Sequence, residues 1–190
     1  MRIADLIQIV DAACERLKLQ YYVTGSVASS YYGDYRSTLD VDVVIEIASW
    51  HVHEFCAQFP EPDWYVSEEA AKTAVQHGGM FNILHSTSGL KIDVCLPKDT
   101  PFAELCFDHK SRVSLEEGAQ VWMSSPEDII LNKLLFYREG RSEKHVRDIG
   151  GIYKAGPERL DLPYIDHWSL RIGVGAEWEA MKRKLGISQA

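Results

Sequence analysis

The chain has 190 residues, a length that fits one domain or one domain with a small appendage. Apolar residues make up 46% of it and charged residues 25%, which is ordinary for a globular protein that builds a core. The formal net charge of −8 argues against broad, nonspecific binding to nucleic acid, because such binding depends on an excess of lysine and arginine. Two local basic stretches, 144–147 and 181–184, are the candidates for a narrower basic surface.

The sequence shows no sign of a membrane segment. No apolar run reaches the roughly 18 residues that a membrane helix needs. Asp5 and Asp11 interrupt the apolar pattern at the N-terminus, which favours an amphipathic helix over a signal peptide. The four cysteines are scattered without a CxxC pair, as is typical of reduced thiols. We therefore expect a cytoplasmic protein without membrane contact.

The first quarter of the chain alternates helices and strands. Helical apolar spacing covers 2–18, and a short strand is expected at 21–25, followed by a helix over 26–33. A strand over 41–47 comes next. A further helix is expected from an N-cap at Ser49.

The middle of the chain predicts more strands. A helix at 67–76 leads to two strands, 80–86 and 90–96, whose short connection indicates a hairpin. Two shorter strands are expected on either side of Glu117-Gly118.

From Ser125 onward the pattern is helical. Ser125 followed by Pro126 and two acids is a strong helix start. Four helices are expected, at 126–138, 142–154, 161–170 and 175–185. The sequence thus predicts an α/β (α+β) core over 1–124, with a small mixed sheet flanked by helices, and a C-terminal helical region over 125–190 packing on it.

Paired acids begin the strand at 41–47. Strand side chains alternate faces, so Asp40 and Asp42 point to the same side. If the strand that contains Asp93 is a neighbour, its carboxylate can join the pair. Three close carboxylates repel one another unless a cation lies among them, and oxygen ligands favour Mg²⁺. The alternative is that each aspartate is a strand-end or turn residue.

A possible phosphate site precedes these acids. Gly25 and Ser26 stand between a strand and a helix, where glycine lets a phosphate approach the free backbone N–H groups. Any tight strand-to-helix turn can use the same residues, so the pair is informative mainly because the Asp40-x-Asp42 strand follows it.

Together these residues resemble the active-site pattern of the polymerase-β-like nucleotidyltransferase superfamily. The pattern consists of Gly25-Ser26, Gly33, Arg36-x-Thr38-x-Asp40-x-Asp42 and Asp93. Lys133 on one expected helix and Arg147-Asp148 on the next are similar to AbiEii-type nucleotidyltransferases, which include toxins of toxin–antitoxin and phage-defence systems. The resemblance covers about residues 20–154.

The resemblance implies a nucleotidyltransferase fold and a reaction. A nucleoside triphosphate would bind at Gly25 and Ser26, and two Mg²⁺ ions held by Asp40, Asp42 and Asp93 would assist attack of a hydroxyl on the α-phosphate.

The remaining site residues have smaller expected roles. Lys133 would reach the triphosphate, and Asp148 would line the same site. Arg36 and Thr38 would orient the aspartate loop. The alternatives are an exposed helix lysine, an Asp148–Lys144 surface pair and structural turn roles for Arg36 and Thr38.

The acceptor is left open. The AbiEii resemblance implies RNA such as the tRNA 3′ end, with an antitoxin protein as a partner. A small molecule, as in antibiotic nucleotidyltransferases, is the alternative acceptor, and a protein hydroxyl is the third. From another class, a catalytically idle module of the same fold would bind only a nucleotide or a partner.

Overall fold

The computed structural model describes residues 1–115 and 118–187. It contains two compact units. We call the first, Met1–Val27 with Ser37–Ser124, the sheet unit, and the second, Ala28–Arg36 with the chain from Ser125, the helical unit. The sequence predicts a single boundary between residues 124 and 125, and that division remains a prediction. In the structure Ala28–Arg36 clusters with the chain from Ser125.

A seven-stranded mixed sheet lies in the sheet unit, in the order β3-β4-β5-β2-β1-β7-β6. The strands are β1 (Gln20–Thr24), β2 (Asp40–Glu46), β3 (Trp64–Val66), β4 (Met80–His85), β5 (Lys91–Cys95), β6 (Ser111–Ser114) and β7 (Gln120–Met123). The predicted hairpin is confirmed, because β4 pairs antiparallel with β5. The pairing that matters most for the site is parallel and joins β2 to β5.

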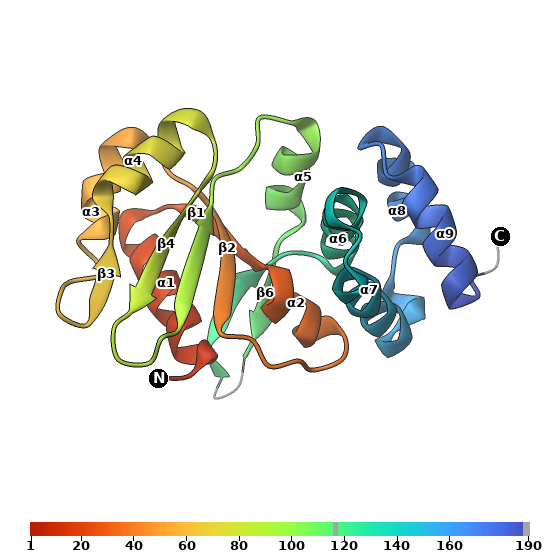
Figure 1. Ribbon diagram of the computed structural model, residues 1–190, viewed down its shortest axis with the longest axis horizontal. Coiled ribbons are helices and arrows are strands. Elements are labelled where there is room, and N and C mark those ends of the chain that lie inside the picture. Colours follow the sequence, from red (N-terminus) through yellow and green to blue (C-terminus); the bar gives the residue numbers. More distant parts are fainter. Residues whose placement is uncertain (116–117, 188–190) are drawn as a thin grey trace. The chain divides into compact units, whose positions relative to one another are not determined.

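Three helices, α1 (Ile3–Leu17), α3 (Val52–Cys56) and α4 (Glu68–His77), cover one face of this sheet (Figure 1). The sheet residues beneath them alternate with polar ones along β2, where Val41, Val43 and Ile45 are completely buried. Apolar burial on every second residue is what holds the strand in one register, since a slip by one residue would expose the set.

A helix also packs on the other face of the sheet, against β1. The ring of Tyr22 on β1 packs edge-on against Phe107 of α5 (Pro101–His109), with ring centroids 5.0 Å apart. Tyr22 is paired with Val44 of β2, so it shares a face with Asp42 rather than with Val43. This face therefore carries the polar residues of β2.

The helical unit is built around α6 (Pro126–Gly140), which packs against α7 (Glu143–Ala155), α8 (Leu162–Arg171) and α9 (Gly175–Leu185). Ser125 caps α6 as expected, since its hydroxyl accepts a hydrogen bond from the Asp128 N–H at 3.1 Å. Trp178 is almost fully buried, and its indole N–H donates to Asp166 at 2.6 Å. The four predicted C-terminal helices are confirmed.

A sequence boundary between the two units falls inside one helix. α2 (Gly25–Tyr32) begins in the sheet unit and ends in the helical unit. Gly33 follows it, and a Cβ on Gly33 would lie 2.6 Å from the backbone nitrogen of Ile152 on α7. Glycine is therefore needed here for close backbone packing within the helical unit.

The structure corrects the predicted helix start at Ser49. Ser49 is the first residue of a 3₁₀ turn, Ser49–His51, which precedes α3, and Ala48 is at the cap position. Strand β3 and helix α5 were not predicted, although Thr100 caps α5 and Pro101 follows it. The predicted turn residue Glu117 lies outside the described residues.

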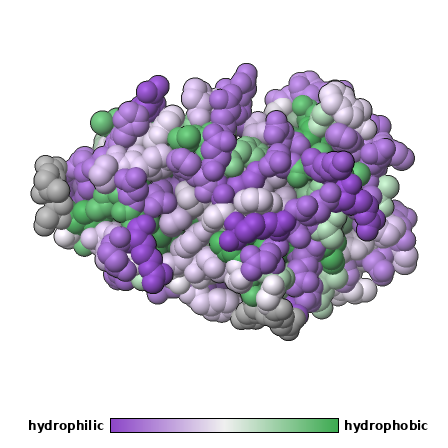
Figure 2. Space-filling view, turned by 180° about the vertical axis from the view of Figure 1, so that it is seen from behind, coloured by the Kyte–Doolittle hydropathy of each residue, from purple (hydrophilic) through white to green (hydrophobic). Residues whose placement is uncertain are grey.

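No helix in the described ranges is long and apolar enough to cross a membrane. On the face seen in Figure 2, hydrophilic residues predominate and hydrophobic ones form separate smaller areas.

Candidate functional site

Four residues form one row across the sheet, on the face opposite α1. Asp42 on β2 lies directly beside Asp93 on β5, and the row continues to Thr24 on β1 and Asn82 on β4. Asp40 precedes Asp42 by two residues on the same strand, so it shares this face. The fold thus brings the three aspartates to one face of two neighbouring strands.

A lysine lies among these acids. Lys91 is paired with Asp40 across the β2–β5 ladder and stands two residues before Asp93. Its Nζ is 2.9 Å from Asp93 Oδ2 and 3.8 Å from Asp40 Oδ1. The hydrogen bond to Asp93, assisted by the charges of the three aspartates, raises the pKa of Lys91, so the ammonium stays charged at neutral pH.

Asp93 is only partly satisfied by this lysine. Asp93 is only 7% exposed, and its buried Oδ1 has no hydrogen-bond partner among the described residues. A buried carboxylate oxygen without a partner is costly and is a position where a cation would be favourable.

The donor atoms on this face are of the chemical type that a hard cation prefers. Burial, with the nearby charges of Asp42 and Asp93, raises the pKa of the Cys95 thiol to about 11, so Cys95 is a protonated thiol in the metal-free protein. The carboxylates of Asp40, Asp42 and Asp93 supply the oxygen ligands that Mg²⁺ prefers. In the described residues no three His, Cys, Asp or Glu side chains are arranged to hold a metal ion, and the Lys91 ammonium lies against two of the three acids.

Asp42 also lies against the start of α2. A Cβ placed on Gly25 would be 1.9 Å from Asp42 Oδ2, and Gly25 has a positive φ of +66°. Only glycine accommodates both the backbone conformation and the carboxylate. Ser26, the next residue, is buried. The predicted phosphate turn is therefore in direct contact with one of the predicted metal ligands.

Thr38 has a local structural role. Its hydroxyl accepts a hydrogen bond from the Asp40 N–H at 3.4 Å and donates to the Asp40 carbonyl at 3.2 Å. These contacts stabilise the entry into β2 and so orient the first aspartate. Arg36 lies in the helical unit, where its Nε is 4.0 Å from Asp148 Oδ1.

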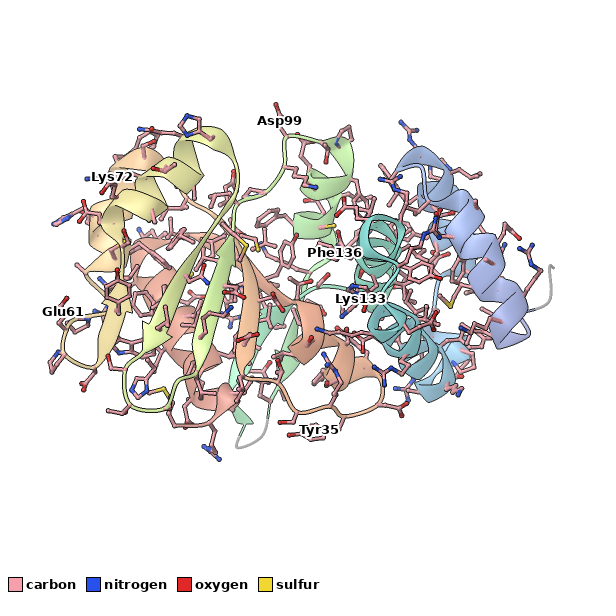
Figure 3. The ribbon with its side chains drawn as sticks, in the orientation of Figure 1. Tyr35, Glu61, Lys72, Asp99, Lys133 and Phe136 are labelled. Atoms are coloured by element: carbon pink, nitrogen blue, oxygen red, sulfur yellow. The ribbon has the colours of Figure 1, made fainter. Side chains whose placement is uncertain are left out.

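In the helical unit, Lys133 of α6 forms a buried ion pair with Asp148 of α7. Its Nζ is 2.5 Å from Asp148 Oδ2, and the two side chains are 6% and 9% exposed. Figure 3 shows Lys133 on α6, beside α7. Asp148 therefore pairs with Lys133 rather than with Lys144, and Lys133 is not an exposed helix lysine.

A pocket of about 130 Å³ opens in the helical unit beside this ion pair. Its lining includes Tyr35, which points outward from the loop after α2 (Figure 3), and the acids Asp34 and Asp148. The cations that line it are Arg36, Lys144 and Arg147. Three cations thus line the pocket with two acids, of which Asp148 is already paired with Lys133. The pocket therefore favours an anionic group, although the chain as a whole is acidic.

The neighbouring histidine is neutral at physiological pH. Burial, followed by the charges of Lys133, Lys144 and Arg36, lowers the pKa of His145. Its ring stacks on Phe136, with centroids 5.8 Å apart. His145 thus adds no further positive charge beside the pocket.

Replacing Lys133 by methionine should reduce the free energy of unfolding by about 3 kcal/mol, because it leaves the Asp148 carboxylate buried without its main counter-ion. Chemical denaturation measures this loss. Lys144→Met is the matched control and should cost much less. Equal losses in the two variants would mean that Asp148 depends on Lys144 as much as on Lys133.

Sequence reasoning missed Lys91. Alternation along the strand places Lys91, Asp93 and Cys95 on one face, but it does not show that the ammonium bridges two strands. The signal that could have found it is a lysine two residues from a buried aspartate, since an acid on such a face needs a partner.

No protein-family model matches the chain, and no curated protein matches it by sequence. Its fold is similar to solved structures of nucleotidyltransferases. An antigenic nucleotidyltransferase-like protein from Paracoccidioides brasiliensis superposes with a TM-score of 0.55 and 20% identity, over 80% of this chain and 74% of that one. ANT(2″)-Ia in complex with adenylyl-2″-tobramycin gives 0.56 and 17%, over 92% and 97%. The predicted nucleotidyltransferase fold is thereby confirmed.

Proposed function

We propose that this chain, which has a nucleotidyltransferase fold, transfers a nucleoside monophosphate from a nucleoside triphosphate to a hydroxyl group. The observation that carries the proposal is the register of β2 and β5, which sets Asp42 beside Asp93 with Asp40 on the same face. Three acids on one face of the sheet can hold divalent cations, and helix α2, which begins at Gly25 beside Asp42, can bind phosphate. Both features are needed for this reaction.

In the proposed reaction the acceptor oxygen forms a bond to the α-phosphorus, and the bond from that phosphorus to the bridging oxygen of the β-phosphate breaks. Pyrophosphate leaves with that bonding pair. Asp93 is the base that takes the hydroxyl proton, because its Oδ1 has no hydrogen-bond partner among the described residues and can accept one.

Asp40, Asp42 and Asp93 would hold Mg²⁺. When bound, Mg²⁺ would supply positive charge that stabilises the attacking and leaving oxygens. Thr38 keeps Asp40 in place through its two hydrogen bonds. Gly25 lets the phosphates approach the backbone at the start of α2, where the N–H groups of a helix N-terminus favour anions.

The helical unit has its own group of cations suited to phosphate. Lys133 is held by Asp148, which fixes the direction of its ammonium, and Arg36 lies beside the same carboxylate. Arg36, Lys144 and Arg147 surround a pocket large enough for a phosphate group. Positive charge from lysine and arginine is the usual means of binding phosphates.

Two acceptors have support, and each defines its own biological role. The motif resemblance to AbiEii-type toxins favours an RNA hydroxyl, such as the tRNA 3′ end, with an antitoxin as partner. The likeness to ANT(2″)-Ia along 92% of the chain favours a small hydroxyl compound, since that protein was solved with an adenylylated aminoglycoside. The net charge of −8 adds support for the small molecule.

The test is transfer of label from each of the four α-labelled nucleoside triphosphates, with Mg²⁺, to total RNA and, separately, to a panel of hydroxyl compounds that includes aminoglycosides. We expect label in one acceptor class and release of pyrophosphate in equal amount. Labelled RNA would select the toxin-like role, and labelled small molecules would select the second.

The proposal fails if the protein binds triphosphate tightly but labels neither RNA, nor small compounds, nor protein. That outcome would favour an idle module of the same fold. Where transfer is observed, a chelator control tests its dependence on metal, because transfer that depends on the three aspartates should stop when Mg²⁺ is removed.

A further inference from the structure

Lys91 is a cation built into the carboxylate face of the sheet. Its ammonium contacts Asp93 on its own strand and approaches Asp40 on the neighbouring strand, at 2.9 and 3.8 Å. Its side chain is 28% exposed, so the ammonium lies at the boundary between the buried Asp93 and solvent. The lysine therefore bridges the two strands that carry all three aspartates.

The need for this cation follows from the charge of the face. Asp40, Asp42 and Asp93 are close enough to repel one another, and repulsion between neighbouring carboxylates destabilises the folded state unless positive charge intervenes. One ammonium offsets only part of this charge. It also reaches only one oxygen of Asp93, since Oδ1 remains buried without a hydrogen-bond partner in the described chain.

The lysine and a divalent cation would need the same carboxylates. A metal ion held by Asp40 and Asp93 must contact the carboxylates that the Lys91 ammonium now contacts, and two cations at such short range repel. An ammonium on a flexible four-carbon stem can move to solvent without disturbing the strand. Exchange of one cation for the other therefore requires no change in backbone register.

We propose that Lys91 is a built-in counter-ion that holds the carboxylate face together before a metal ion binds and that competes with the metal ion for Asp93 and Asp40. The inference rests on the proposed function in taking these carboxylates as the metal site. It assigns Lys91 the role of setting metal affinity: the ammonium weakens metal binding and stabilises the metal-free protein.

The experiment compares the full-length wild type with Lys91→Met, which keeps the apolar stem, and Lys91→Gln, which keeps a hydrogen-bond donor. Mn²⁺ binding without nucleotide is followed by electron paramagnetic resonance, and thermal unfolding is measured with and without Mg²⁺. Lys72→Met is the matched control, since Lys72 on α4 also forms an ion pair, with Glu68, in the sheet unit (Figure 3).

We expect both Lys91 variants to bind Mn²⁺ roughly tenfold more tightly than the wild type, because the competing charge is gone. Their metal-free Tm should fall, and Mg²⁺ should raise it more than it raises the wild-type Tm. Lys72→Met should leave Mn²⁺ affinity unchanged. The gain should vanish when Asp93→Asn is added to Lys91→Met, since the contested carboxylate is then neutral.

Unchanged or weaker Mn²⁺ binding in both Lys91 variants would overturn the role of Lys91 while leaving the metal site and the proposed function intact. A gain that persists in the double variant would also overturn it, because the contest would then not concern Asp93. If neither the wild type nor the Lys91 variants bind Mn²⁺, the metal site itself is absent, and the proposed function falls with the inference.

Discussion

Replacing Asp42 by asparagine should lower the rate of nucleotide transfer by at least about a thousandfold, while the protein stays folded. Asp42 lies in the middle of the proposed site, beside Asp93 and against the first residue of α2. Asparagine keeps the shape of the side chain but removes the charge that a divalent cation requires. Transfer of label from an α-labelled triphosphate, with the thermal unfolding curve of each sample, measures both effects.

The matched control is Glu46→Gln, which removes a charge from an exposed position at the end of the same strand. It should leave transfer unchanged. Removing one of three neighbouring negative charges should also leave the Tm of Asp42→Asn equal to or above that of the wild type. Full activity in Asp42→Asn would rule out the carboxylate face as the catalytic site.

Replacing Gly25 by alanine should reduce the free energy of unfolding by about 4 kcal/mol, the sum of left-handed backbone strain and a steric clash. The φ of Gly25 is +66°, and the new methyl group would lie 1.9 Å from Asp42 Oδ2. Relief requires movement of Asp42 or of the start of α2. Triphosphate use should therefore be lost together with stability, which urea denaturation and label transfer would measure.

Gly78 provides the control for this prediction, because it also has a positive φ. Its φ of +67° matches that of Gly25, but a Cβ there would meet nothing within 4 Å. Gly78→Ala should therefore report the strain of a positive φ without a steric clash. A loss in Gly25→Ala that exceeds the loss in Gly78→Ala indicates the clash with Asp42.

A double variant locates that clash. Gly25→Ala combined with Asp42→Ala removes Oδ2 and Cγ, the two atoms nearest to the new methyl group, and should recover part of the lost stability. Equal losses in Gly25→Ala and Gly78→Ala, or no recovery in the double variant, would show that Asp42 does not lie against Gly25.

Local patterns predicted most of the fold. The helical spacing of α1, the apolar alternation of β2 and the Ser125-Pro126 start of α6 each depend on neighbours within a few residues, and all three elements formed where expected. The predicted cap at Ser49 was wrong, because Ser49 is the first residue of a 3₁₀ turn and Ala48 takes the cap position. Strand β3 is only three residues long, which is too short for an alternating pattern to predict a strand.

Pairings between distant segments could not be obtained in this way. The sheet order places β2 between β1 and β5, which are far from each other in sequence. Helix α5 was not predicted either, although Thr100 followed by Pro101 is a typical helix start. The Lys133–Asp148 pair illustrates the same limit. Helical spacing offered Lys144 as the partner of Asp148, but packing of α6 against α7 brings Lys133 closer.

The amino-acid sequence by itself determined which side of each strand the acids take, because alternation is a property of the extended backbone. It also determined the kinds of ligand atom available and the glycine at the start of α2. Tertiary structure decided that β2 and β5 are neighbours in a register that sets Asp42 beside Asp93, and that Lys91 bridges them. The reason is that register depends on burying the apolar faces of several strands at once, which no single segment encodes.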